Sequence, residues 1–129
     1  MRQTLLVLVA MLGAIFTSAF PARAEGRKAS PPDSLPKILL ALALDNFPKA
    51  HCGNDQPCAP ATAEERTHPP LTDDQAHAIV TAASTSAIAR HCGLDWQRRN
   101  FEPLMRYHRE SLKLTERQMA LVGLLHGIS

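Results

Sequence analysis

The chain has few β-branched and few aromatic residues for its 129 positions. Beyond residue 24 it contains two valines and four isoleucines, against fourteen alanines and thirteen leucines. Valine, isoleucine and the aromatic residues favour strands, whereas alanine and leucine favour helices. The composition therefore predicts an all-α fold, and it argues against a sheet-rich domain.

Motifs of the common catalytic and nucleotide-binding sites are also missing from the sequence. No serine lies in a Gly-x-Ser-x-Gly elbow, no histidine begins a His-Glu-x-x-His motif, and the glycines are isolated instead of grouped in a phosphate-binding loop. No Cys-x-x-Cys pair points to a thioredoxin-like or haem-binding protein. We therefore expect no catalytic residue, and we favour a non-catalytic binding or interaction module over an enzyme.

The N-terminus has the pattern of an export signal. A positive start at Arg2 is followed by an apolar run over 5–16 and by the small-x-small site Ala22-Arg23-Ala24. The run is too short to cross a bilayer core of about 30 Å as a stable helix. We predict a signal peptide over 1–24, a flexible lead-in over 25–33 and a single helical domain over 34–129. The mature protein is then expected in the periplasm or outside the cell, without stable membrane insertion.

Charge is balanced once the signal is removed. Loss of Arg2 and Arg23 lowers the 14 basic residues to 12, against 12 acidic ones. A neutral exported chain is a poor candidate for nucleic-acid binding, because that binding depends on neutralising phosphates with Lys and Arg. The expected partners are a second copy of this chain or another exported protein.

The first two predicted helices enclose a long loop. The first helix is expected to begin near Ser34 and to stop before Pro48. The second begins at a capping box formed by Thr72 and Gln75 and stops at Gly93. Residues 49–70 between them contain four prolines and two of the three cysteines, so they are expected to form a long Pro-rich loop.

Two further helices are predicted in the C-terminal part. The third runs from residue 95 to about residue 112, where Pro103 either kinks it or follows a new start capped by Asn100. The fourth begins at a second capping box, formed by Thr115 and Gln118, and is expected to end at 126–127.

Three cysteines allow one internal disulfide in one of three pairings: Cys52, Cys58 and Cys92 are the candidates. We predict a bridge from Cys92 to either Cys52 or Cys58, because closing the longer loop removes more entropy from the unfolded chain. Local closure between Cys52 and Cys58 remains the alternative, since Gly53 and Pro57 allow a tight turn.

A copper- or zinc-binding protein is the alternative function. Imidazole and thiolate groups suit these metals, and four such ligands would complete a tetrahedral site. The candidate ligands are His51, Cys52, Cys58 and Cys92. His91 and His126 have a simpler interpretation, because a cationic histidine in the last turn of a helix favours the helix C-terminus.

The first and fourth predicted helices are apolar around much of their circumference. The leucines concerned include Leu40, Leu44, Leu121 and Leu124. Two such helices either pack against each other in the core or leave part of this surface for self-association or another partner. The sequence favours packing of these helices against each other in the core, and an interaction surface is the alternative.

The C-terminal half contains Cys92-Gly93-Leu94-Asp95-Trp96, then Arg117-Gln118-Met119-Ala120, then Leu125-His126-Gly127. This pattern resembles small uncharacterised exported proteins of proteobacteria, over roughly residues 72–127. The resemblance agrees with export and implies no activity.

Overall fold

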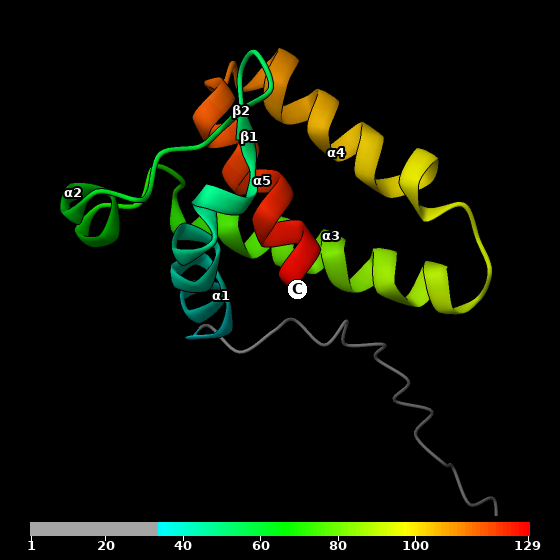
Figure 1. Cartoon of the computed structure of the whole chain (residues 1–129). Helices are drawn as coiled ribbons and strands as arrows, with labels where there is room; N and C mark the ends of the chain where they lie inside the picture. The colour runs from blue at the N-terminus through cyan, green and yellow to red at the C-terminus, as the bar shows by residue number, and fades with distance from the viewer. Residues whose placement is uncertain (1–33) are drawn as a thin grey trace, which may run out of the picture.

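Helices make up most of residues 34–129, the part of the chain that this computed structural model describes (Figure 1). The helices are α1 (Ser34–Asp45), α2 (Ala63–Thr67), α3 (Asp73–His91), α4 (Glu102–Arg106) and α5 (Glu116–Ile128). The all-α prediction is confirmed. The predicted signal peptide and the lead-in before residue 34 lie outside the described residues.

Three helices share the core. The chain runs along α3, turns, and returns through α4, while α5 packs against both α1 and α3 (Figure 1). The core is formed by Leu40, Ala43, Leu44, Phe47, Cys58, Leu71, Ala76, Ile79, Val80, Leu121, Val122 and Leu125. Burying this apolar surface is the main force that holds the helices together.

The leucines considered for an interaction surface belong to this core. Leu40, Leu44 and Leu121 are at most 3% exposed, and Leu124 packs against the same cluster. Leu40, Leu44 and Leu121 are therefore core residues and form no interaction surface, because α1 and α5 cover each other's leucines, whereas Leu124 is partly buried. The apolar side chains that α1 leaves exposed are Ile38 and Leu42.

Capping boxes start three of the helices. The two predicted ones are present, with the Thr72 and Thr115 side chains each accepting a hydrogen bond from the backbone N–H three residues later. The third, Thr62 with Glu65 at the start of α2, lies in the segment 49–70, whose prolines favour a loop in the sequence. At the other end of α3, Gly93 adopts a left-handed φ of 70° and the Leu94 N–H bonds the Ala89 carbonyl, which terminates the helix as predicted.

The predicted structureless loop is largely ordered. After a 3-10 turn (Phe47–Lys49), β1 (His51–Cys52) and β2 (Gln56–Pro57) form a small antiparallel hairpin. Its turn, Gly53, Asn54 and Asp55, has positive φ throughout, which these residue types tolerate.

The third predicted helix is continuous through Pro103. Wide π turns at Gln97–Phe101 and Tyr107–Ser111 lie on either side of α4, so Asn100 caps no new start. Helix α5 continues through Gly127 to Ile128, and its predicted end at 126–127 is therefore slightly short.

Candidate functional site

The three cysteines do not form the predicted long-range bridge. Cys52 bonds Cys58, and Cys92 is a free, exposed thiol at the C-terminal end of α3. The prediction of a bridge to Cys92 is wrong, because the hairpin already holds the other two cysteines with their Cα atoms 4.9 Å apart. Local turn geometry prevails over the larger entropy gain of a longer loop.

The four candidate metal ligands are not brought together. Two of their sulfurs are used in the disulfide, His51 is exposed on β1, and Cys92 stands at the end of another helix. Within residues 34–129, no group of three or more His, Cys, Asp or Glu side chains is arranged to hold a metal ion. The geometry therefore lends no support to the proposed copper or zinc site.

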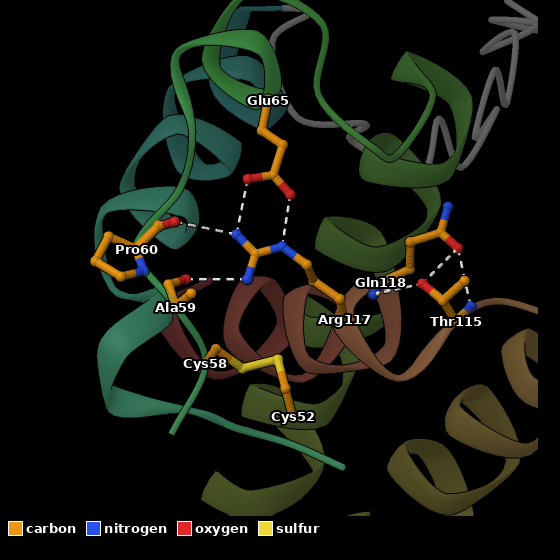
Figure 2. Close-up of a disulfide and its surroundings, with 8 residues drawn as sticks. All are labelled: Cys52, Cys58, Ala59, Pro60, Glu65, Thr115, Arg117 and Gln118. Carbon is orange, nitrogen blue, oxygen red and sulfur yellow. Dashed lines mark hydrogen bonds and ion pairs between the residues drawn. A yellow bond between two sulfur atoms is a disulfide. The ribbon is translucent and has the colours of Figure 1, made fainter. Parts of the chain in front are cut away.

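A second cluster beside the disulfide is structural. Figure 2 shows the guanidinium of Arg117 between the carboxylate of Glu65 and the backbone carbonyls of Ala59 and Pro60. The same guanidinium lies 4.2 Å from the centre of the Phe47 ring. The protein thus engages four of the five N–H donors and one face of this cation, which gives the arginine a structural role.

One cavity lies between the starts of α1 and α3. Its volume is about 480 Å³, and its lining includes Lys37, Asp73 and His77. Lys37 and Asp73 already pair with each other at 3.1 Å and both are exposed. Asp74 adds a further exposed carboxylate to the lining, so this cavity has no buried charged group to discriminate a ligand.

A smaller cavity is built by three segments around His126. Ser86 and Arg90 come from α3, Trp96 follows the turn after α3, and His126 lies in the last part of α5. The cavity measures about 140 Å³. The remaining lining residues are Ala83, Ala87, Gly127 and Ser129. We refer to this site as the His126 pocket.

The imidazole of His126 is held on several sides. Its Nε2 lies 3.0 Å from the Ser86 Oγ, a hydrogen bond between buried side chains 40 residues apart in sequence. The Trp96 ring stacks on it at 6.0 Å between centroids, and the Phe101 ring lies 4.8 Å away. The histidine is 8% exposed and its orientation is therefore well defined.

A π turn explains how two aromatic rings reach the same histidine. In an α-helix, residues five apart point about 140° away from each other, since each residue turns about 100°. The π turn Gln97–Phe101 joins the Glu102 N–H to the Gln97 carbonyl, five residues back. This wider turn brings Trp96 and Phe101 to one face, with their rings 6.2 Å apart.

Burial lowers the pKa of His126, because a charged imidazole would lose its hydration. Its ring is therefore neutral near pH 7, and the interpretation of His126 as a cation at the helix C-terminus is wrong. A neutral imidazole both donates and accepts one hydrogen bond. His91, by contrast, is exposed in the last turn of α3, as the interpretation of that residue requires.

The sequence offered one weak signal for this pocket. From the sequence, Trp96 and Phe101 belong only to the third predicted helix, and His126 is interpreted as a cation at a helix C-terminus. Pro103 inside a helical pattern was the visible irregularity, since proline cannot donate to the carbonyl four residues back. Nothing local indicated that Ser86 and His126 would meet.

In residues 34–129, none of the helices has the length and hydropathy needed to cross a membrane.

Comparison with protein-family models, with curated proteins and with solved structures finds no match for this chain.

Proposed function

We propose that this protein is a small non-catalytic binding protein and that the His126 pocket is its binding site. The observation that carries the proposal is the convergence of Ser86, Trp96 and His126, from three separate segments, around one cavity. Binding sites combine an apolar or aromatic wall with a few placed polar groups, and this pocket has both.

The size of the pocket limits its ligand. Its volume of about 140 Å³ is close to that of an engineered cavity of roughly 150 Å³ that binds benzene. A single ring or a molecule of similar size therefore fits, whereas a drug-sized ligand needs at least about 300 Å³.

Binding agrees better than catalysis with the chemistry of the pocket. The bond between Ser86 and His126 resembles a nucleophile with its base. In the described part of the chain, however, no carboxylate contacts His126 to orient it. Ser86 also lies within the continuous helix α3 and is 3% exposed, so its hydroxyl is poorly placed to attack a substrate.

The single tryptophan of the chain, Trp96, tests this proposal directly, since its fluorescence reports on the pocket wall. We expect a set of one-ring compounds, both neutral and charged, to contain members that change the Trp96 emission and the NMR signals of His126. Ala87→Leu should abolish these changes by filling the pocket from an exposed position of α3.

Ala78→Leu is the matched control, because Ala78 is exposed on the same helix and does not line the pocket. It should leave every response unchanged. If no compound of the set perturbs Trp96 or His126 in the wild type, the proposed binding site is rejected.

We also propose that the protein is exported to the periplasm or beyond. The N-terminal pattern ending at Ala24 supports this, and a disulfide such as Cys52–Cys58 persists in an oxidising compartment. N-terminal sequencing of the protein from cell fractions tests it. The exported protein should begin at Glu25, whereas a full-length chain retained in the cytoplasm would contradict the proposal.

A further inference from the structure

The His126 pocket contains a cation without a partner. Arg90 lies on α3 one turn after Ser86 and lines the same cavity. It is the one charged side chain among the lining residues of the described structure. Arg90 makes no ion pair within residues 34–129, and neither do Arg99 and Arg106. The other arginines of this part of the chain each contact a carboxylate.

The other walls of the pocket suit a flat, uncharged body. The Trp96 indole lies nearly parallel to the His126 ring, at 16° between planes, and both rings line the cavity. Ala83 and Ala87 contribute small apolar side chains on the side of α3. Aromatic walls of this kind favour a ring that stacks offset or edge-to-face.

Arg90 supplies the group suited to an anion with oxygen atoms, and its side chain is exposed where it lines the cavity. A guanidinium binds a carboxylate through two parallel N–H donors, which is a favourable geometry for arginine. The Ser86 hydroxyl is already paired with His126, so it does not compete for Arg90. The pocket therefore combines one cationic side chain with aromatic and small apolar groups, beside the hydroxyls of Ser86 and Ser129.

We infer that the His126 pocket binds a small organic carboxylate, with its flat apolar body against Trp96 and its carboxylate on Arg90. This inference rests on the proposed binding function and narrows it to a class of ligand. The fit of a single ring in about 140 Å³ makes a monocyclic carboxylate the simplest member of that class.

Benzoate and benzamide provide a matched pair of probes, because they share ring and shape and differ in charge. Each is titrated into the full mature protein, in a buffer free of other carboxylates, with Trp96 emission and calorimetry as readouts. We expect benzoate to bind at least about tenfold more tightly than benzamide, which is the factor expected for one hydrogen-bonded contact to a charged group.

Two arginine variants test whether Arg90 causes the preference for benzoate over benzamide. Arg90→Gln should weaken benzoate about tenfold and leave benzamide unchanged, since it removes only the charge at the pocket edge. Arg106→Gln is the matched control, because Arg106 is exposed on α4 and does not line this pocket. It should bind both probes as the wild type does. Circular dichroism confirms that each variant is folded.

The outcomes separate the two proposals. Equal binding of benzoate and benzamide, or a preference for benzoate that survives Arg90→Gln, overturns the carboxylate inference and leaves the binding function intact. The same holds if neutral rings bind and benzoate does not. Failure of every ring compound to reach Trp96 overturns both the inference and the proposed function.

Discussion

Arg117 and Glu65 form a two-pronged ion pair across 52 residues of sequence. The two carboxylate oxygens of Glu65 accept hydrogen bonds from Nε and Nη2 of Arg117, at 2.6 and 2.7 Å. Arg117 also donates to the carbonyls of Ala59 and Pro60, at 2.9 and 3.2 Å. One side chain thus fastens α2 and the segment after the disulfide to the start of α5 (Figure 2).

Replacing Arg117 with leucine should lower the free energy of unfolding by about 2 kcal/mol, because it removes charge-assisted hydrogen bonds and leaves a partly buried carboxylate unpaired. Urea denaturation measures the loss. Arg117→Lys should restore only part of it, since an ammonium cannot bind the carboxylate in the same two-pronged manner. Arg98→Leu, at an exposed pair with Asp95, should cost less than about 0.5 kcal/mol.

Acid should weaken the fold in two separate steps, of which the first belongs to His126. Burial lowers its pKa in the folded protein, so the unfolded chain takes up a proton first, near pH 6.5. The free energy of unfolding should therefore fall as the pH drops below about 6.5, by at most about 1.4 kcal/mol per pH unit. His126→Gln should remove this step, and a flat stability between pH 7 and 5 in the wild type would contradict it.

The second step belongs to Glu65. Hydrogen bonds from Arg117 lower the pKa of its carboxyl from 4.5 to about 2. The stabilisation is complete above about pH 4.5 and should be lost as the pH falls from there towards 2, because the unfolded chain binds the proton first. Glu65→Gln should abolish this second step and leave the His126 step in place, in the same series of urea titrations.

Peptide mapping without reduction should recover Cys52 linked to Cys58, with Cys92 open to alkylation. Changing both bridged cysteines to serine should lower the free energy of unfolding by about 2 kcal/mol, the value expected for closing so short a loop. Cys92→Ser should change stability little, because its side chain is exposed. Recovery of a peptide that joins Cys92 to either partner would refute this pairing.

Pro103→Ala should loosen the wall of the His126 pocket. The new N–H can bond the Arg99 carbonyl four residues back, which favours an ordinary α turn in place of the π turn. Trp96 and Phe101 would then point apart, and the Trp96 emission should shift to longer wavelength with greater quenching by acrylamide. Pro60→Ala, at an exposed position away from the pocket, should leave the emission unchanged. An unaltered emission in Pro103→Ala would show that proline does not maintain this turn.

Helix starts were predictable because their signals lie within a few residues of one another. Thr72 with Gln75, and Thr115 with Gln118, satisfy backbone donors of their own first turns, and this chemistry works wherever the helix packs. Gly93 likewise ends α3 through its own left-handed φ. The all-α class followed from composition for the same reason, since helix propensity is a property of each residue in its local segment.

Tertiary structure decided three features: the cysteine pairing, the burial of the leucines of α1 and α5, and the His126 pocket. Both possible partners of Cys58 were chemically equivalent until the hairpin placed Cys52 beside it. The apolar faces of α1 and α5 became core only because these helices cover each other. Ser86 and His126 meet across 40 residues because α3 and α5 pack together, and a π turn adds Trp96 to them. Helix capping depends only on residues that are close in the sequence. Contacts between distant segments depend instead on how whole helices bury their surfaces against one another.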